Sequence, residues 1–420
     1  MNVVIIGAGL VGLTSAYALH KAGAKVVVVE RREGPGLETS YGNAALQHPS
    51  LVDPWNSPGV AWDLLKWIGR DDAPMLLHLA QVPALTGWGL RFLANSRPAR
   101  FQANTLKNLR LALLARREMA AIREDTRVSY QCRKTGTLAV ARSAAALSAA
   151  QAHAAFIAPH GVQFRSLSRD ETVAMEPALA PIAQAIQGAV FYPEDERGDP
   201  HAFSTELTNW LTARGVTFLF ETEVTALRAD AKRVRAIDTL AGEVEADAFV
   251  LAAASLSPAL AAPLKVRIPV KPVKGYSATI EAKGNPHMPK VPVSDSGLHA
   301  AVVPIGDDRL RVAGTAEFAG FDASVRRPRV DNLLKLLKRI YPKFVESVDA
   351  SSFEAWTGFR PLSPDGVPIV GQTRIANLFL NTGHGHIGWT TAAGSARLLA
   401  DVMMERAPVL PAGEYALARF

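Results

Sequence analysis

The sequence predicts an α/β fold in which two domains are woven together by several crossings of the chain. Three observations predict it. The chain opens with a β-branched strand, a helix rich in Ala and Leu and a second buried strand, and it closes with a strand, a glycine-rich turn at 383–388 and a helix. Between these ends, residues 216–251 have the pattern of a β-meander. Residues 266–320 alternate apolar and polar residues in hairpin style.

The individual elements follow from local composition. Val3–Ile6 is a β-branched run ended by glycine, which suits a strand buried on both faces. Leu10–Ala22 is a helical run closed by Gly23. The other expected elements are the strand Val26–Val29, a mostly helical stretch over 55–124, the strand Thr137–Val140, the helices Ala144–His160 and His201–Arg214, the strands Val216–Phe220, Val234–Asp238, Gly242–Ala246 and Ala248–Leu251, the hairpin strands Lys274–Ile280 and Leu310–Ala313, the helix Asp331–Tyr341 capped by Asp331, the strand Leu378–Asn381 and the helix Trp389–Glu405.

Composition excludes several classes of protein. The 420 residues are 48% hydrophobic and 20% charged, which is typical of folded domains and not of a disordered chain. The single cysteine, Cys132, leaves no partner for an intramolecular disulfide and too few ligands for a Cys-based zinc or iron–sulfur centre. Such cysteine usage favours a reducing compartment.

Charge and hydropathy limit the partners. The net charge of +7 is spread along the chain in short runs, so we expect no nucleic-acid partner. No apolar stretch reaches the roughly 18–20 residues of a transmembrane helix. The start, MNVVIIGAGLVGL, lacks a basic leader, so we do not interpret it as a signal peptide. We expect a cytoplasmic protein, either free or in peripheral contact with the cytoplasmic face of the inner membrane.

A glycine fingerprint follows the first strand. Gly7 allows a tight turn, Gly9 lets the backbone approach a pyrophosphate, and Gly12 lets the helix pack closely on the sheet. Leu10 and Val11 begin the helix, whose N-terminal N–H groups attract phosphate. This context predicts dinucleotide binding.

The choice between FAD and NAD depends on the two ends of the chain. Glu30 ends the second strand and can accept hydrogen bonds from a ribose diol, and Arg31 is compatible with an adenine-side contact. The glycine-rich turn over 381–389 opens a closing helix whose N-terminus can face the pyrimidine side of a flavin. This order favours FAD.

With both ends in view, the sequence resembles FAD-dependent amine oxidoreductases of the D-amino-acid oxidase superfamily, and within it bacterial D-amino-acid dehydrogenases of the small-subunit type. The resemblance covers nearly the whole chain. The motifs that carry it are Glu38-Thr-Ser-Tyr-Gly-Asn-Ala-Ala45, Pro54-Trp-Asn-Ser-Pro-Gly59, Leu65-Lys-Trp67, Val273-Lys-Gly-Tyr-Ser277, Val312-Ala-Gly-Thr-Ala-Glu317, Trp356-Thr-Gly-Phe-Arg-Pro361 with Pro364-Asp365, Gly383-His-Gly385 and Gly388-Trp-Thr390.

The resemblance implies a glutathione-reductase-like Rossmann FAD domain interleaved with an α+β substrate domain that contains a mixed sheet. We expect the FAD domain to comprise residues 1–50, 195–265 and 355–420, and the substrate domain residues 51–194 and 266–354. The flavin would lie between the two domains.

The resemblance also implies which residues contact the cofactor. Two departures from the usual pattern bear on them: Ala254 and Leu256 replace a glycine and a tryptophan, and His386 stands where threonine is common. Since Cys132 matches no tether motif, we expect non-covalent FAD. The implied contacts are Ser40, Asn43 and Ala44 near the isoalloxazine ring, Val224 at adenine, Ala253 and Ala254 beside the dinucleotide, Gly383 in the turn, and Ile387, Gly388, Trp389 and Thr390 along the pyrimidine edge.

Oxidation of an amino acid at Cα requires a group that holds the substrate carboxylate. Arg360 is our candidate, because a guanidinium binds a carboxylate through two parallel hydrogen bonds. Its setting within Gly358–Pro361 matches the carboxylate-binding arginine of the superfamily.

Further candidates for the catalytic site are polar residues in the same motifs. Tyr276 can offer a hydroxyl to the carboxylate or amine, and His48 and His386 are candidate substrate contacts or proton acceptors. His384 is interpreted as a turn residue or flavin contact. The two turn histidines have no nearby acid, so we expect no metal site.

The sequence therefore predicts an FAD enzyme that deaminates D-amino acids oxidatively to 2-oxo acids and ammonia and passes electrons to a quinone or another carrier. Three alternatives stay open. The substrate can be narrower, D-proline or a hydroxy-D-proline whose hydroxyl meets His386. The reaction can be a glycine or sarcosine oxidation with oxygen as acceptor. The chain can also be a flavin-binding electron-transfer subunit that needs a partner.

Overall fold

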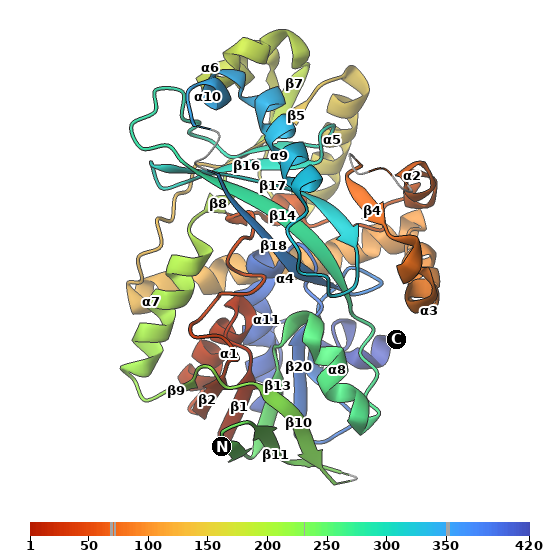
Figure 1. Cartoon of the computed structure of the whole chain (residues 1–420), viewed down its shortest axis with the longest axis vertical. Helices are drawn as coiled ribbons and strands as arrows, with labels where there is room; N and C mark the ends of the chain where they lie inside the picture. The colour runs from red at the N-terminus through yellow and green to blue at the C-terminus, as the bar shows by residue number, and fades with distance from the viewer. Residues whose placement is uncertain (68–69, 71–72, 231, 350–352) are drawn as a thin grey trace.

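The computed structural model describes residues 1–67, 70, 73–230, 232–349 and 353–420. They form two halves stacked along the long axis of the molecule, each built around a large β-sheet (Figure 1). Helices and strands are both substantial, which confirms the predicted α/β class.

The lower half in Figure 1 contains a six-stranded sheet whose neighbouring strands are parallel except at one edge. In spatial order the strands are β19 (Ile369–Gln372), β20 (Leu378–Thr382), β13 (Ala248–Leu251), β1 (Asn2–Ile6), β2 (Lys25–Val29) and β9 (Thr217–Leu219). Two adjacent strands, β1 and β2, consist largely of Val and Ile, and most of these side chains are buried because both faces of the sheet are covered.

Each face of this sheet has its own cover. Side chains at alternate positions of β1 explain the division: Val3 and Ile5 join the core under the helices, whereas Val4 and Ile6 join the core on the opposite face. The helices on the first face are α1 (Leu10–Lys21), α4 (Pro98–Thr126), α7 (Pro200–Thr212) and α11 (Gly388–Met403). The second face is covered by the antiparallel strands β10 (Val224–Ala229), β11 (Val234–Thr239) and β12 (Gly242–Glu245) and by α8 (Ser257–Ala261).

The upper half contains a nine-stranded mixed sheet. Two of its pairings, β15 with β5 and β17 with β4, are parallel, and the others are antiparallel. In spatial order its strands are β18 (Phe353–Leu362), β14 (Lys271–Glu281), β17 (Arg309–Phe318), β16 (Ala300–Ile305), β15 (Val293–Asp295), β5 (Thr137–Ala141), β7 (Gly188–Tyr192) and β6 (Arg165–Ser168), and β4 (Met75–Leu77) pairs with β17.

Shorter elements complete the fold. The helix α9 packs on β14 and β17, where Leu333 and Leu337 meet Ala278 and Ile280 in one core. The remaining elements are α2 (Val60–Trp67), α3 (Val82–Ala94), α5 (Ala144–Ile157), α6 (Arg169–Met175), α9 (Arg327–Ile340), α10 (Pro342–Glu346), the paired strands β3 (Leu46–Gln47) and β8 (Glu196–Arg197), and the 3-10 helices η1 (Pro49–Leu51), η2 (Leu79–Gln81), η3 (Ala158–His160), η4 (Pro177–Ala185), η5 (Ala254–Leu256), η6 (Ala262–Leu264), η8 (Ala412–Glu414) and η9 (Leu417–Arg419).

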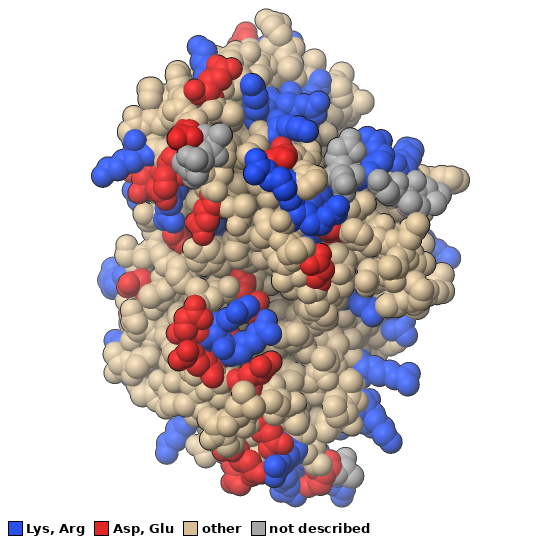
Figure 2. Space-filling view, in the orientation of Figure 1, with Lys and Arg blue, Asp and Glu red and all other residues tan. Residues whose placement is uncertain are grey.

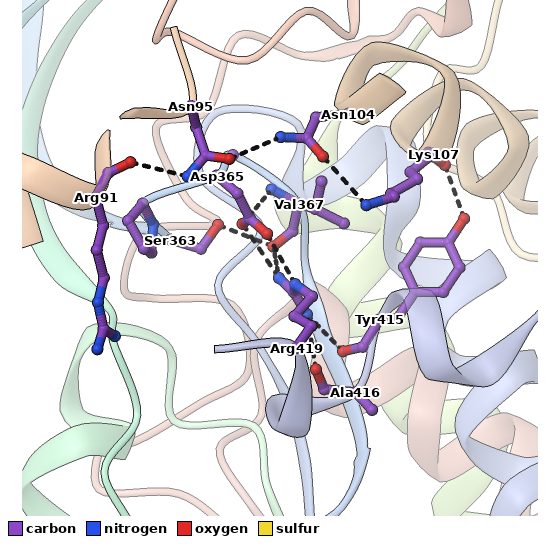
Figure 3. Close-up of polar contacts among 12 residues, drawn as sticks. Arg91, Asn95, Asn104, Lys107, Ser363, Asp365, Val367, Tyr415, Ala416 and Arg419 are labelled. Carbon is purple, nitrogen blue, oxygen red and sulfur yellow. Dashed lines mark hydrogen bonds and ion pairs between the residues drawn. The ribbon is translucent and has the colours of Figure 1, made fainter. Parts of the chain in front are cut away.

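The C-terminal residues fasten the turn between β18 and β19 (Figure 3). Arg419 donates to both oxygens of Asp365, at 2.8 and 3.2 Å, and to the carbonyl of Val367 at 2.6 Å. Tyr415 donates its hydroxyl to the carbonyl of Lys107 in α4 at 2.8 Å. The turn that follows Arg360 in the chain is therefore held from two sides.

One helix boundary predicted from the sequence is wrong. The helix α9 begins at Arg327, four residues before Asp331, and its N-cap is Arg326. Pro328 explains the difference, because proline is favoured in the first turn of a helix, where a missing N–H costs no hydrogen bond. Asp331 pairs instead with Arg327 one turn earlier, at 2.8 Å.

The strands of the six-stranded sheet come from all three segments that the sequence assigned to the FAD domain. We keep the two-domain boundaries as a proposal on this basis. On the face drawn in Figure 2, acidic and basic side chains are interspersed.

Candidate active site

One cavity of about 560 Å³ receives side chains from both halves of the molecule. From the lower half it is lined by the start of α1, by residues after β13 and by the turn between β20 and α11. From the upper half it is lined by β14, β17 and β18, and the segment from Thr39 to Trp55 runs along its side. A cavity at the carboxyl ends of parallel strands is the usual ligand site of an open α/β sheet.

The glycine fingerprint forms the cradle that the sequence predicts. Gly7 has a φ of +110°, and a Cβ there would lie 2.7 Å from the carbonyl oxygen of Ala252. A Cβ on Gly12 would lie 1.9 Å from the carbonyl oxygen of Gly7, so a side chain at either position has no room. The N-cap of α1, Gly9, supplies no side-chain cap, and the first turn therefore keeps N–H groups for a ligand.

The acid at the end of β2 is buried and already partly bonded. Glu30 accepts from the backbone N–H of Ala8 at 2.8 Å and from that of Arg32 at 2.9 Å. These bonds fix its carboxylate beside the fingerprint and leave lone pairs for a ribose. Arg31 instead forms an ion pair with Glu38 at 2.5 Å, so the structure gives no support to its adenine contact.

The segment expected beside the flavin is held by a residue that the sequence analysis missed. Arg311, buried in β17, donates to the carbonyl oxygens of Tyr41 and Asn43 at 3.0 and 2.9 Å, and Ser40 accepts from the N–H of Leu10 at 3.1 Å. Burial lowers the pKa of Arg311 to about 10. A charged residue between two apolar ones, Leu310 and Val312, was the signal in the sequence.

The C-terminal turn is locked onto α1. His384 bonds to Asn381 and to Thr391, both at 3.0 Å, and Asn381 donates to Ser15 at 2.9 Å. Burial lowers the pKa of His384 to about 3, so its ring is neutral at physiological pH. This agrees with its interpretation as a turn residue.

The turn also presents the start of α11 to the cavity. Gly388 and Trp389 line the cavity, Ile387 is an N-cap without a side-chain bond, and Thr390 accepts from the N–H of His48 at 3.2 Å. Two helix N-termini thus open into one cavity without a side-chain bond from their own N-cap residues, and each attracts negative charge.

The residues predicted at adenine and beside the dinucleotide lie at the start of β10 and after β13. Val224 begins β10 and is half-buried in the core beneath the sheet. Ala253 and Ala254 follow β13, and the carbonyl of Ala254 accepts from Thr382 at 3.0 Å. Ala254 has a φ of +47°, a conformation in which glycine is favoured, so its replacement of the usual glycine is accommodated with backbone strain.

The carboxylate-binding candidate is half-buried and lines the cavity. Arg360 lies flat on β14, since a Cβ on Gly275 would be 1.9 Å from its Nη1, and that nitrogen donates to the carbonyl of Thr315 at 3.0 Å. Its guanidinium carbon lies 5.3 Å from the ring centre of Trp55. Burial alone lowers its pKa, to about 10, so within the described chain no carboxylate compensates its charge.

Two neutral histidines lie close to this guanidinium. His386 stacks on Trp55 with ring centres 5.0 Å apart and an interplanar angle of 15°. Burial lowers its pKa to about 3, and the charges of His48 and Arg360 contribute in the same direction. Burial likewise lowers the pKa of His48 to about 4, and its Nδ1 has no hydrogen-bond partner in the described part of the chain. The sequence assigned no role to Trp55, and the structure places its ring against both His386 and Arg360.

Tyr276 lines the cavity, but its side chain does not join this group. Side chains alternate along β14, and Tyr276 points with Ala278 toward α9, whereas Gly275 faces Arg360. Its hydroxyl donates to the buried carboxylate of Glu317 at 2.7 Å. The prediction of a substrate contact through this hydroxyl is not supported by the geometry, because β-strand parity places it on the opposite face of the sheet.

The described residues contain no group of three or more His, Cys, Asp and Glu side chains arranged to hold a metal ion. Among the helices that the structure describes, none is both long enough and apolar enough to cross a membrane.

These features define a class of protein: two helix N-termini at one cavity, with a glycine cradle and a buried acid beside the first of them, suit a flavin dinucleotide. The model of the FAD dependent oxidoreductase family (DAO) matches residues 2–402, and the chain belongs to this family. The resemblance stated from the sequence is thereby confirmed, and FAD is the cofactor.

Curated relatives are similar over their full length. The chain is 41% identical over 421 residues to D-amino acid dehydrogenase of Paramagnetospirillum magneticum, covering 100% of this chain and 99% of the relative. It is 39% identical over 420 residues to D-amino acid dehydrogenase of Sinorhizobium medicae, covering 100% of both. Glycine oxidase from Geobacillus kaustophilus has the same fold, with a TM-score of 0.77 at 23% identity over 100% of this chain and 98% of that one.

Proposed function

We propose that the protein oxidises D-amino acids to 2-oxo acids and ammonia with non-covalent FAD. The observation that carries the proposal is the half-buried guanidinium of Arg360, which lines the cavity and has no compensating carboxylate among the described residues. A charge that is partly withdrawn from water is costly unless a ligand pairs with it. Its planar donors suit a carboxylate, and the curated relatives named D-amino acid dehydrogenase support the same substrate class.

The two histidines orient the amine in this proposal. His386 and His48 have pKa values of about 3 and 4, so each is a neutral hydrogen-bond acceptor at pH 7 and a weak base. The substrate amine therefore donates a hydrogen bond to a histidine nitrogen. Because the histidines are weak bases, the extra proton of the ammonium form leaves to solvent before the reaction. We expect kcat/KM for a D-amino acid to rise with pH as the free substrate amine loses its proton.

The chemistry is a two-electron oxidation. When bound, FAD accepts the hydride that leaves Cα. The amine loses a proton as the C–N bond becomes an imine, and water then hydrolyses the imine to the 2-oxo acid and ammonia. The described chain supplies alignment: Arg360 holds the carboxylate, and the stacked rings of Trp55 and His386 wall the cavity beside it.

Anaerobic titration of the FAD-loaded protein tests the proposal. Bleaching of the flavin absorbance by D-alanine or D-proline, and not by their L-isomers, is the expected result. Arg360→Lys should raise KM by about tenfold to a hundredfold, because a point charge cannot replace the bidentate contact. Unchanged KM in this variant would show that the carboxylate lies elsewhere, and a spectrum that no amino acid bleaches would contradict the proposed function.

The same titration separates the narrower alternatives. Preference for D-proline over D-alanine, with a selective loss for hydroxyproline in His386→Thr, would indicate the cyclic substrate. Bleaching by glycine or sarcosine with peroxide formed in air would indicate the oxidase reaction.

We further propose that electrons pass to a quinone at a membrane surface. The outer side of α2 and α3 exposes apolar side chains, and the inner side of α2 lines the cavity through Val60, Asp63 and Trp67. Arg91 and Lys66 on these helices add positive charge that suits anionic lipid. The exposed apolar residues of this surface are Trp62 (71% exposed), Leu79 (65%), Val82 (41%), Leu90 (66%) and Leu93 (38%).

Sedimentation with vesicles of phosphatidylglycerol and phosphatidylcholine tests this proposal. We expect binding that falls when Trp62 and Leu90 are both replaced by serine, while turnover with a water-soluble dye as acceptor is unchanged. Equal vesicle binding by the wild type and the double variant would contradict the assignment of this surface.

A further inference from the structure

Thr315 occupies a backbone conformation that a β-branched residue rarely adopts. Its φ is +55°, in the left-handed region. It is the extra residue of a β-bulge, because on β14 Gly275 pairs with Ala316 and the next residue, Tyr276, pairs with Gly314. Such strain persists only where the surroundings enforce it, and it concentrates at functional sites.

The bulge changes what Thr315 presents to the cavity. As the extra residue, Thr315 has no partner residue on β14, and its carbonyl accepts from Nη1 of Arg360 at 3.0 Å. The glycine beside it, Gly275, clears the space in which the guanidinium lies. The bulge at Thr315 and the glycine at Gly275 together form a flat surface that fixes one side of the Arg360 guanidinium.

The hydroxyl of Thr315 is left without a partner. Thr315 is 6% exposed and is one of the residues that line the cavity, yet within the described residues its buried Oγ1 makes no hydrogen bond. Buried hydroxyl groups in folded proteins are nearly always bonded, because an unpaired one costs free energy. Neither the hydroxyl of Thr315 nor the guanidinium of Arg360 has a negatively charged acceptor among the described residues, and such a group would suit both of them.

We propose that Thr315 is a second carboxylate-binding residue: its Oγ1–H donates to the carboxylate that Arg360 holds, and the strained bulge is the device that places both donors on one ligand. The inference deepens the proposed function and rests on its assignment of Arg360 to the substrate carboxylate. It also explains why a β-branched residue occupies a position where glycine would be free of strain.

The test is binding of propanoate to the full-length FAD-loaded protein, measured by calorimetry and by the perturbation of the flavin absorbance. Propanoate has the carboxylate and methyl group of D-alanine but no C–N bond to oxidise. Thr315→Val keeps the shape and branching and removes only the hydroxyl, and we expect it to weaken binding by about tenfold or more. Thr315→Ser should restore most of the affinity.

Two further variants control for structure. Thr208→Val removes another buried hydroxyl that lacks a partner in the described chain; Thr208 is also 6% exposed but does not line the cavity, and we expect no change in binding. Thr315→Gly removes the strain together with the hydroxyl. It should unfold at a temperature no lower than the wild type and still bind propanoate weakly.

The outcomes separate the inference from the proposed function. If D-alanine bleaches the flavin and Thr315→Val binds propanoate as tightly as the wild type, the inference is wrong and the proposed function stands. If Arg360→Lys and Thr315→Val both weaken propanoate binding but no amino acid bleaches the flavin, the inference stands and the proposed function falls. Loss of FAD affinity in Thr315→Val with unchanged propanoate affinity would assign the hydroxyl to the cofactor and overturn the inference, as would a wild type that does not bind propanoate.

Discussion

Asp195 should make the stability of this protein depend on pH in an unusual direction. The carboxyl is 2% exposed, and its hydrogen bond from the Ser50 hydroxyl, at 2.5 Å, only partly offsets its burial. Burial raises its pKa from 3.8 to about 7. The folded protein therefore holds this proton more tightly than the unfolded chain does.

The sign and size follow from this difference. Because the unfolded chain releases the proton near pH 4 and the folded protein near pH 7, unfolding releases a proton in that window, and stability falls as the pH rises through it. One pKa unit is worth about 1.4 kcal/mol, so the full effect is roughly 4 kcal/mol above pH 7. Asp195→Asn, whose amide does not ionise, should remove most of this dependence.

Urea unfolding of the FAD-loaded protein at pH 5 and pH 8 measures the effect. We expect Asp195→Asn to be close to the wild type at pH 5 and more stable than it by a few kcal/mol at pH 8. Asp199 is the matched control: Arg309 at 2.7 Å and two backbone N–H groups hold its pKa below the usual value, against the opposing effect of burial. Asp199→Asn should therefore lose stability at pH 8. A difference between Asp195→Asn and the wild type that is the same at both pH values would refute the reasoning.

Three further predictions concern the site and its supports. Gly275→Ala should raise KM for a D-amino acid by about tenfold or more, because the new Cβ would displace the guanidinium of Arg360. Gly87→Ala is the control: a Cβ there meets no described atom within 4 Å, so the kinetics should be unchanged. Equal KM values for the two variants would contradict the role of Gly275 in positioning Arg360. Arg419→Ala should destabilise the protein by about 2–4 kcal/mol, because it leaves the 8% exposed carboxylate of Asp365 without its cation. A double-mutant cycle with Asp365→Ala should recover part of that loss, and strict additivity would show that the pair is not coupled. Removal of FAD should lower the unfolding temperature, and added FAD should raise it with concentration; a midpoint indifferent to FAD would contradict binding to the folded state.

Much of the nucleotide half was predictable because its signals are local in the chain. The glycine fingerprint, the helix that follows it and the acid at the end of β2 lie within thirty residues, and the backbone conformation of Gly7 demands glycine wherever it occurs. The helix α9 shows the limit of such reasoning, since Asp331, an acidic residue suited to a cap, was outweighed by Pro328 three residues earlier.

The catalytic side of the cavity depended on contacts between distant segments. The sequence identified Arg360 and His386 as candidates, but strand parity removed Tyr276 from the group, and a bulge in β17 added Thr315. Side chains along a strand alternate between the two faces of the sheet, and packing against the core sets which of them point inward. One inserted residue reverses this alternation.

The sequence by itself determined the family, the cofactor and the α/β class, because these depend on motifs whose residues act through their own backbone or through near neighbours. Only the tertiary structure decided which polar side chains share the cavity with Arg360, and which of them are neutral there. Hydrogen bonding and burial depend on distances between residues hundreds of positions apart, as for the bond from Arg311 to the carbonyl of Tyr41, and no local pattern records such distances.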